Sequence, residues 1–155
     1  MMNTIVRQQT LLPRRLSFAA LMVLYEENYV LACRLIPRNW RRRQAISHSN
    51  DDLSLHLRCI SRDKFTTLYL MTYYIGERAE PGLLFRLYHD AVLAEAVGFA
   101  GHEPTVDQMD GMAPAWVFRH KWQLNLFLNK WLRYCLGRGH DFTPCTKPTR
   151  SRSHR

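Results

Sequence analysis

Apolar residues recur every three to four positions in two long stretches of the chain, which is the spacing of one buried helix face. The first stretch predicts a helix that Ser17 caps and that runs to about Ile36, where Pro37 stops it. The second predicts a helix over residues 119–136, which two glycines end. The apolar stripes contain Leu21, Leu24, Leu31 and Leu35 in the first helix, and Leu124, Leu128, Trp131 and Cys135 in the second.

Between these helices, apolar residues alternate with polar ones, as in a strand with one buried face. Residues 53–59 alternate cleanly, and residues 65–75 are rich in β-branched and aromatic side chains. The polar segment 61–64 between them has the composition of a turn, so the two strands are predicted to form an antiparallel hairpin. Residues 76–82, which include Pro81, are predicted to close this hairpin off as a loop.

A third strand is predicted to start at Leu83. Beyond Asp90 two interpretations stay open, because residues 91–97 contain alanines and a glutamate that favour a short helix. Alternatively, the strand continues, or it bends through a bulge at His89-Asp90 and runs on to Phe99. We favour the continued strand.

Residues 100–118 contain two prolines and two glycines and are predicted to be a long loop. The order of elements indicates an α+β fold, an antiparallel β-sheet flanked by an N-terminal and a C-terminal helix that pack on it. We predict one domain over residues 16–140. Residues 1–15 are predicted to be a flexible basic tail, and residues 141–155 a disordered basic tail.

The formal net charge of +9 is unevenly distributed. Residues 1–50 hold eight arginines against two glutamates, and residues 119–155 hold nine basic residues against one acidic residue. Residues 51–118 hold only five basic residues against ten acidic ones. A basic protein attracts anionic partners, but the acidic middle of this chain weakens the case for a dedicated nucleic-acid domain.

The cysteines Cys33, Cys59, Cys135 and Cys145 lie far apart, and no pair forms a C-x-x-C motif. Three of them fall within apolar stretches, which is typical of free thiols in a reducing cytoplasm. The sequence has no zinc-ligand spacing, and we predict neither a metal nor a cofactor.

The N-terminus resembles an export signal, because Arg14-Arg15 precedes the apolar run 16–24. However, Glu26 and Glu27 interrupt the apolar stretch, and no small-residue cleavage site follows it. The run is also shorter than the roughly 20 residues that span a bilayer. We interpret it as a core helix and expect a cytoplasmic protein that does not enter a membrane.

The segment Arg86–Ala91 is the one apolar stretch in which arginine, tyrosine, histidine and aspartate crowd together. On a strand, Arg86, Tyr88 and Asp90 share one face and His89 lies on the other, so His89 and Asp90 meet only through a bulge. In that case His89 is a candidate general base. The alternative is that Arg86 pairs with Asp90 or Glu95, while Tyr88 and His89 form structural hydrogen bonds. The candidate cluster is Arg86, Tyr88, His89, Asp90 and Glu95.

A compact basic run follows Pro37 and surrounds one aromatic residue. It is predicted to contact phosphate groups, with Trp40 available to stack on a base. The alternative is a solvated connector in which Trp40 is an anchor. The candidate anion or nucleic-acid contacts are Arg38, Trp40, Arg41, Arg42 and Arg43.

Three blocks of the chain resemble the bacterial YqiB-like family, small cytoplasmic proteins of unknown function. The blocks are Tyr25–Tyr29 with Leu35–Arg38, Arg86–Ala91 with Ala94-Glu95, and Gln123–Leu128 with Trp131–Leu136 and Gly139. The resemblance covers roughly residues 22–140, while both tails and the run 40–43 depart from the family pattern. It implies a cytoplasmic bacterial protein and brings no activity, cofactor or catalytic residue.

These observations favour a non-enzymatic binding or accessory module that acts mainly through contacts with an unknown protein partner. The first alternative is nucleic-acid binding through the basic loop and the C-terminal helix. The second is a small hydrolase or lyase that uses His89 and Asp90. No phosphate loop, dinucleotide fingerprint or nucleophile elbow is present in the sequence to support an enzyme.

Overall fold

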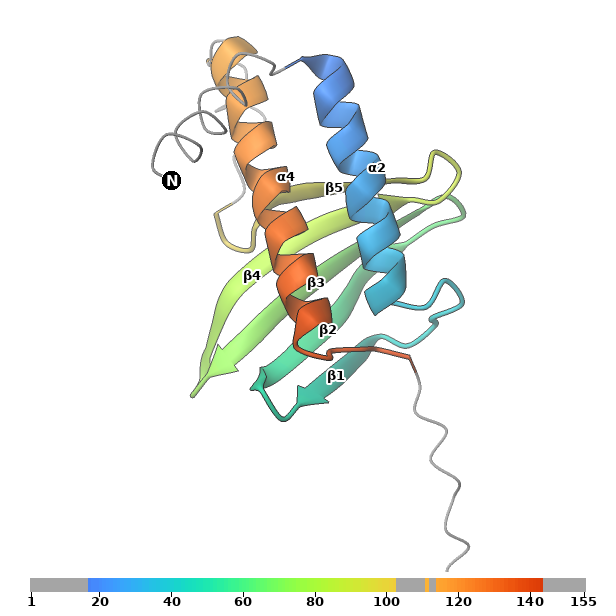
Figure 1. Cartoon of the computed structure of the whole chain (residues 1–155), viewed down its shortest axis with the longest axis vertical. Helices are drawn as coiled ribbons and strands as arrows, with labels where there is room; N and C mark the ends of the chain where they lie inside the picture. The colour runs from blue at the N-terminus through green and yellow to red at the C-terminus, as the bar shows by residue number, and fades with distance from the viewer. Residues whose placement is uncertain (1–16, 103–110, 112–113, 144–155) are drawn as a thin grey trace, which may run out of the picture.

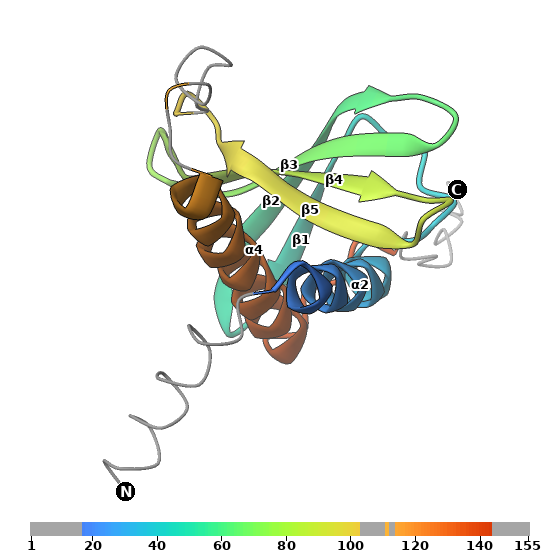
Figure 2. The same cartoon turned by 90° about the horizontal axis from the view of Figure 1, so that it is seen from above.

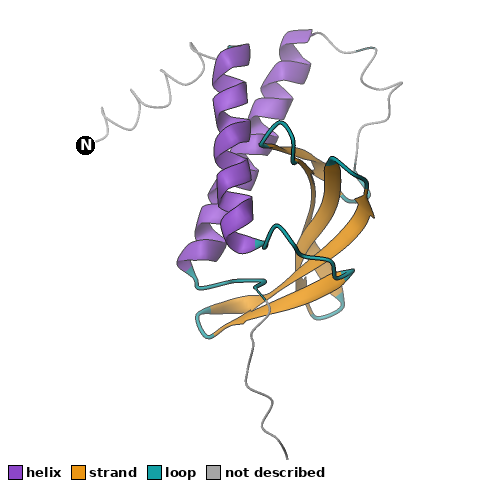
Figure 3. Cartoon of the chain, turned by 90° about the vertical axis from the view of Figure 1, so that its right-hand side faces the viewer, coloured by secondary structure: helices purple, strands orange, loops and turns teal. Residues whose placement is uncertain are grey.

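The computed structural model describes residues 17–102, 111 and 114–143, which form two layers (Figure 1). One layer is a five-stranded antiparallel sheet with the strand order β1-β2-β3-β4-β5, and the other consists of two helices on the same face of that sheet (Figure 3). This is the α+β architecture that the sequence predicts. The elements are α2 (Phe18–Leu35), β1 (Gln44–Ser49), β2 (Asp52–Arg62), β3 (Thr66–Ile75), β4 (Arg78–Tyr88), β5 (Leu93–Phe99) and α4 (Pro114–Gly137).

The first helix, α2, has the predicted bounds to within one residue. Ser17 is its N-cap, and the Ser17 hydroxyl oxygen accepts a hydrogen bond from the backbone N–H of Ala20 at 3.1 Å. The helix ends at Leu35, directly before Ile36-Pro37, as proline requires. Neither α2 nor α4, the two described helices, contains a stretch that is long and apolar enough to cross a bilayer.

The second helix, α4, starts earlier than the predicted residue 119. Pro114 is its first residue, a position that suits proline because the first N–H groups of a helix have no partner within the helix. The predicted loop 100–118 is therefore shorter than expected, and residues 103–110 and 112–113 lie outside the described part of the chain.

Buried asparagines fix the two helices against the sheet. The helices run side by side in the same direction (Figure 1). The Asn28 amide of α2 donates to the carbonyl oxygen of Asn125 in α4 at 3.2 Å, and the Asn125 side-chain oxygen accepts from the backbone N–H of Ala96 in β5 at 2.7 Å. Because buried polar groups need partners, these bonds connect α2, α4 and β5 in one arrangement.

The core lies between the helices and one face of the sheet, as the view from above makes clear (Figure 2). Alternate residues of β2, β3 and β4 point into it, which confirms the predicted hairpin of β2 and β3. On β5 the inward residues are Ala94 and Ala96, whose small side chains let both helices approach this strand. The largest fully buried side chains include Leu35, Leu55, Leu57, Met71, Leu83, Phe85, Leu128 and Leu132.

Strand β1 was not predicted. It is an edge strand, and Ser47 is its one fully buried residue, while Ile46 is half exposed. Because a polar residue faces inward and an apolar residue faces outward, the sequence of this edge strand lacks the alternation of buried apolar and exposed polar residues that predicts a strand. Its place is fixed by pairing with β2, in which Ala45 lies opposite Leu57.

The predicted loop 76–82 is wrong over most of its length, because β4 begins at Arg78. Pro81 and Gly82 together lie opposite the single residue Thr72 of β3, at a bulge between the pairs Met71–Leu83 and Tyr73–Glu80. A bulge is one of the few sites within a sheet that tolerate proline. The Pro-Gly signal therefore marks a bulge in this chain and not the end of a strand.

The residues after Tyr88 form a strand that ends at Phe99, as favoured from the sequence, but it is a separate strand and not a continuation of β4. The chain reverses at residues 89–92 and returns as β5, antiparallel to β4, with Tyr88 opposite Leu93. Val92 has a φ of +57°, a rare conformation for a β-branched residue. The sequence gives no warning of this turn, because it contains neither glycine nor proline.

The described chain continues past the predicted domain boundary at residue 140. Phe142 is buried, and its N–H donates to the carbonyl oxygen of Leu35 at 2.9 Å. Cys33 and Cys59 are half-buried free thiols and Cys135 is a fully buried one. Cys145, the predicted tail 1–15 and the tail beyond residue 143 lie outside the described residues.

Candidate functional site

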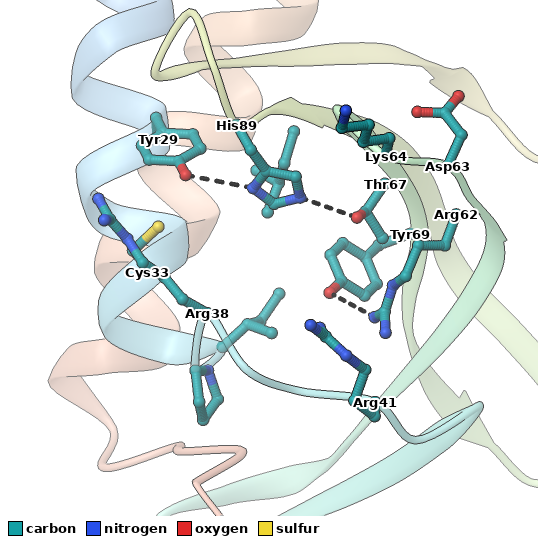
Figure 4. A pocket seen from close by; sticks show the side chains of 13 residues that line it. Tyr29, Cys33, Arg38, Arg41, Arg62, Asp63, Lys64, Thr67, Tyr69 and His89 are labelled. Atoms are coloured by element: carbon teal, nitrogen blue, oxygen red, sulfur yellow. Dashed lines mark hydrogen bonds between the residues drawn. The ribbon is translucent and has the colours of Figure 1, made fainter.

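A pocket of about 450 Å³ opens between the C-terminal end of α2 and one edge of the sheet, where β2 and β4 end and β3 begins (Figure 4). Most of the side chains that line it are cationic or otherwise polar, and a few apolar residues complete the lining. The cations are Arg38, Arg41, Arg62 and Lys64; the other polar groups are Tyr29, Cys33, Asp63, Thr67, Tyr69 and His89; and the apolar residues are Ile36, Pro37 and Leu87.

The four cationic side chains of this pocket come from two segments. Arg38 and Arg41 belong to the loop after α2, and Arg62 and Lys64 belong to the β2–β3 hairpin. Within the described part of the chain, none of the four forms a salt bridge within 4.0 Å. The cations therefore gather around the pocket without an ion pair among the described residues.

The arginines are held in place by uncharged groups. Arg38 lies over the Tyr29 ring, with 5.7 Å between the guanidinium carbon and the ring centroid. Arg62 donates to the Tyr69 hydroxyl at 3.4 Å, and Arg41 donates to the carbonyl oxygen of Trp40 at 3.4 Å. These long contacts position the guanidinium groups and leave most of their donors free.

Asp63 is the one carboxylate that lines the pocket, and its two oxygens accept hydrogen bonds within the β2–β3 turn. They accept hydrogen bonds from the Thr66 hydroxyl at 2.8 Å, from the Thr66 N–H at 2.8 Å and from the Phe65 N–H at 3.0 Å. These bonds lower the pKa of Asp63 and shape the β2–β3 turn. Asp63 thus stabilises the hairpin and forms no ion pair with the arginines.

A bulge in β2 brings Arg62 to the pocket. Cys59 pairs with Tyr69, but the next two pairs are Ser61 with Leu68 and Arg62 with Thr67, so Ile60 is one residue in excess on the β2 side. In a regular strand of the same length, Arg62 would point away from the helices, on the same face as Arg58. The bulge reverses the alternation and directs Arg62 to the pocket side of the sheet.

His89 lies in the middle of the polar lining. Its Nδ1 atom is 3.2 Å from the Tyr29 hydroxyl, its Nε2 atom is 2.8 Å from the Thr67 hydroxyl, and its backbone N–H donates to the carbonyl oxygen of Phe65 (Figure 4). Burial lowers the pKa of His89 from its ordinary value of 6.5, and the charges of the three pocket arginines lower it further. His89 is therefore neutral at pH 7.

The predicted pairing of His89 with Asp90 does not form. Both ring nitrogens of His89 contact hydroxyl groups, and Asp90 is exposed in the turn after β4. The physical reason is the strand geometry: Leu87 and His89 face the helices, while Asp90 lies beyond the end of the strand. In this arrangement two hydroxyl groups, and not the Asp90 carboxylate, orient the His89 ring.

The remaining members of the predicted cluster, Arg86 and Tyr88 of β4 and Glu95 of β5, lie outside the pocket lining. Glu95 accepts hydrogen bonds from the hydroxyls of Tyr88 at 3.3 Å and Tyr25 at 3.0 Å, and it lies 3.9 Å from the Lys121 ammonium. Arg86 is opposite Glu95 across β4 and β5, yet the two form no ion pair within 4.0 Å. The predicted pairing of Arg86 with Asp90 or Glu95 is wrong, because Glu95 turns toward the helices.

The basic run after Pro37 divides into three parts. Arg38 and Arg41 line the pocket, while Arg42 and Arg43 are exposed outside its lining. Trp40 is only 3% exposed and packs edge-on against Tyr69, with 5.7 Å between the ring centroids. The prediction that Trp40 is available for stacking is therefore wrong, and the alternative of an anchoring tryptophan describes it.

A second histidine cluster lies at the opposite end of β2. His140 Nε2 is 2.9 Å from an Asp52 carboxylate oxygen, and Nδ1 is 3.0 Å from the Ser47 hydroxyl. Tyr73 donates to Asp52 at 2.6 Å, and the Asp141 N–H donates to Ser47 at 3.0 Å. His140 and Ser47 are both buried, so this serine has no access to a substrate, and the cluster fixes the C-terminal segment against β1 and β2.

The pKa of Asp52 in this cluster is lowered from its ordinary value of 3.8. Burial acts in the opposite direction, but hydrogen bonds from Tyr73 and His140 outweigh it. The sequence gave no partner for His140, since Asp52 is 88 residues away along the chain. Among the described residues, no three histidine, cysteine or acidic side chains gather as a metal site would require.

Sequence reasoning missed more than half of the polar pocket lining. Tyr29, Cys33 and Thr67 lie on elements that were predicted correctly, and their periodicity marks them only as core positions. Arg62 and Lys64 lie in a predicted turn, where charged residues are ordinary. The available signal was the pair of cations in that turn, but nothing in the sequence connects it to the loop after α2.

Comparisons with known proteins place the chain in a family. A family model described as "Protein of unknown function (DUF1249)" matches residues 32–141, which include every pocket residue except Tyr29. The chain is 29% identical over 135 residues to the uncharacterized protein YqiB of Escherichia coli strain K12, and equally similar to the YqiB proteins of strains O6:H1 and O157:H7. Each match covers 79% of this chain and 90% of the relative. No solved structure matches the chain. The protein therefore belongs to the DUF1249 family of proteins of unknown function, as its resemblance to YqiB implied.

Proposed function

We propose that this protein is a non-enzymatic binding module whose ligand carries a phosphate group or a similar oxyanion, held in the pocket around His89. One observation supports the proposal: Arg38, Arg41, Arg62 and Lys64 converge without a salt-bridge partner among the described residues. Like charges brought together repel, and such a group of cations lowers stability unless an anion joins it. Guanidinium groups match the oxygens of phosphate with paired hydrogen bonds.

The uncharged groups of the pocket suit the same kind of ligand. Tyr29, Thr67 and Tyr69 carry hydroxyl groups there, and hydroxyls are donors to an anion when their other contacts allow. Both ring nitrogens of His89 already contact protein hydroxyl groups, so a bound substrate would have to displace one of these groups to reach the ring. This occupancy favours binding over hydrolysis.

Nucleic-acid binding is the second candidate function, and a specific feature favours it. Exposed Arg42 and Arg43 continue outward from the pocket loop, and the Arg43 carbonyl oxygen accepts from the N–H of Cys59, next to exposed Arg58. A phosphodiester backbone could follow this strip of arginines beside the pocket. Binding of this kind would depend on Arg42 and Arg43, whereas binding of a small anion would not.

The test is a calorimetric titration of the full chain with pyrophosphate. We expect Arg41→Gln and Arg62→Gln each to reduce affinity about tenfold, since a hydrogen bond to a charged group contributes about 1.5 kcal/mol. Arg42→Gln is the matched control, because it removes the same charge from the same loop outside the pocket. Equal affinity in all four proteins, or no heat of binding in any, contradicts the proposal.

A single-stranded oligonucleotide titrated into the same four proteins separates the two candidates. If nucleic acid is the ligand, Arg42→Gln weakens oligonucleotide binding as much as Arg41→Gln does, and affinity falls steeply with salt. The protein partner and the cytoplasmic location expected from the sequence stay predictions. A pull-down from cell lysate at two salt concentrations tests the partner, because charge-driven partners are lost at the higher one.

A further inference from the structure

The hydrogen bonds of His89 limit what the empty pocket offers to an anion. A neutral imidazole has one N–H donor and one bare nitrogen that accepts. Its two nitrogens contact the Tyr29 and Thr67 hydroxyls at 3.2 and 2.8 Å. One hydroxyl must therefore donate its only proton to His89, while the other accepts from His89 and keeps its proton available.

Protonation of His89 changes this balance. An imidazolium donates from both nitrogens, so both hydroxyls accept and both hydroxyl protons become available to the pocket. The pocket then gains one hydroxyl donor and one positive charge in a single step. Both changes favour an anion over water.

Titratable or charged groups face His89 from every element around it, and the arginines among them oppose its protonation. They are Tyr29 and Cys33 of α2, Arg38 and Arg41 of the following loop, Arg62, Asp63 and Lys64 of the hairpin, Tyr69 of β3, and Asp90 after β4. The arginines and burial lower the pKa of His89, and Asp90 acts weakly in the opposite direction. An anion bound among the same arginines offsets their charge and removes much of this opposition.

We propose that the pocket binds a doubly charged oxyanion together with one proton on His89, so that affinity for the anion rises as the pH falls below 7. The inference rests on the proposed anion site and adds the linked proton and the double charge of the ligand. By thermodynamic linkage, the bound anion raises the affinity of His89 for a proton by the same factor.

Sulfate is the probe for this proposal, because it carries two negative charges throughout the range and does not itself titrate. Calorimetric titrations at about pH 7.5 and about pH 5.5 should show a rise in sulfate affinity of roughly tenfold, the effect of a pKa that changes by one unit. Titrations in buffers of different ionisation heat should show an uptake of about half a proton at a pH midway between the free and bound pKa values of His89, as a change of one pKa unit requires.

His89→Gln should bind sulfate with an affinity that changes little over the same range, because glutamine does not titrate. His102→Gln is the control, since it removes an exposed histidine outside the pocket and should retain the rise. An NMR titration of the unmodified protein provides a readout that needs no variant: sulfate should raise the pKa of the His89 ring.

The possible failures are distinguishable. Sulfate affinity that is equal at both pH values, or a rise that His89→Gln retains, overturns the linked proton and leaves the anion site in place. No sulfate binding at either pH, together with pyrophosphate binding that Arg62→Gln leaves unchanged, overturns the anion site and the linked proton together.

Discussion

Two histidines lie near opposite ends of β2, and the groups around them differ. At the Asp52 end, His140 is 2% exposed. One of its ring nitrogens contacts the Asp52 carboxylate, and the other contacts the Ser47 hydroxyl. At the Arg62 end, His89 is half-buried among arginines, and its nitrogens contact only uncharged hydroxyls. The first histidine contacts a carboxylate, whereas the second is surrounded by arginines.

This difference separates a structural cluster from a candidate site. A buried histidine and carboxylate that satisfy one another join distant segments of the chain and leave nothing for a ligand. Cations that gather around a pocket without an ion pair repel one another and lower the stability of the protein, and a bound anion restores it. The same residue type thus has two roles, which its neighbours decide.

The largest expected effect is on stability at the His140 end. His140→Ala leaves Asp52 and Ser47 buried without their partner, so the free energy of unfolding should fall by about 3 kcal/mol. His89→Gln, at the other end of β2, should change it by less than about 1 kcal/mol, since solvent reaches that site. Urea denaturation of both variants measures the difference. Equal losses would show that the two histidines have the same structural role.

The next effect is a loss of stability in acid that depends on Asp52. Its folded pKa is below the ordinary 3.8, so the ionised carboxylate stabilises the folded state above pH 3.8, and this stability is lost as the pH falls through the folded pKa. At neutral pH, the free energy of unfolding of Asp52→Asn should be about 1.5 kcal/mol lower than that of the original chain. The variant should also lack the part of the stability loss in acid that comes from protonation of Asp52. Urea midpoints at several pH values measure it, and an unchanged acid slope in the variant would contradict it.

A third prediction tests the bulge that directs Arg62 into the pocket. Exchanging the residues at two neighbouring positions, Ser61→Arg with Arg62→Ser, keeps the composition but moves the guanidinium to the other face of β2. Affinity for pyrophosphate should fall about tenfold, or about 1.4 kcal/mol, in calorimetry. A double variant that binds as the original chain does would contradict the assigned faces of β2.

The smallest expected effect is the pH dependence of stability that His89 causes. Its folded pKa lies below the unfolded value of about 6.5, so the unfolded chain takes up the proton first, and stability falls as the pH drops below 6.5. His89→Gln should lose this small component, and saturating sulfate should reduce it in the original chain. Thermal unfolding at about pH 7 and about pH 5.5 measures both. A decline of the same size in the variant would assign it to other groups.

The parts of the fold that follow from local pattern were predictable from the sequence. Helix α2, most of α4 and the β2–β3 hairpin follow from apolar periodicity and from the signals at Ser17 and Pro37. Strand β1 and the reversal at Val92 were not predictable. The first is fixed by tertiary pairing alone, and the second uses a backbone conformation that valine rarely adopts.

The candidate site was predictable only in part. It depends on which face of a strand each residue occupies, and on contacts between residues far apart in the sequence. Arg38, Arg41 and His89 were selected as chemically distinctive, but on separate segments and with separate roles. The side that Arg62 faces depends on one bulge, which strict alternation cannot reveal. Thr67 and Tyr29 meet His89 from 22 and 60 residues away, and no local pattern connects positions so far apart.

The excess residue at Ile60 separates the face of Arg62 from its distance along the strand. In a regular strand, residues two apart share a face, but across the bulge Cys59 and Arg62 are three residues apart and face the same side. A relative without the excess residue and without the bulge keeps its arginine on the pocket side, because the arginine then lies two residues after the position of Cys59. A relative of the same length whose strand is regular directs that arginine to the opposite side of the sheet.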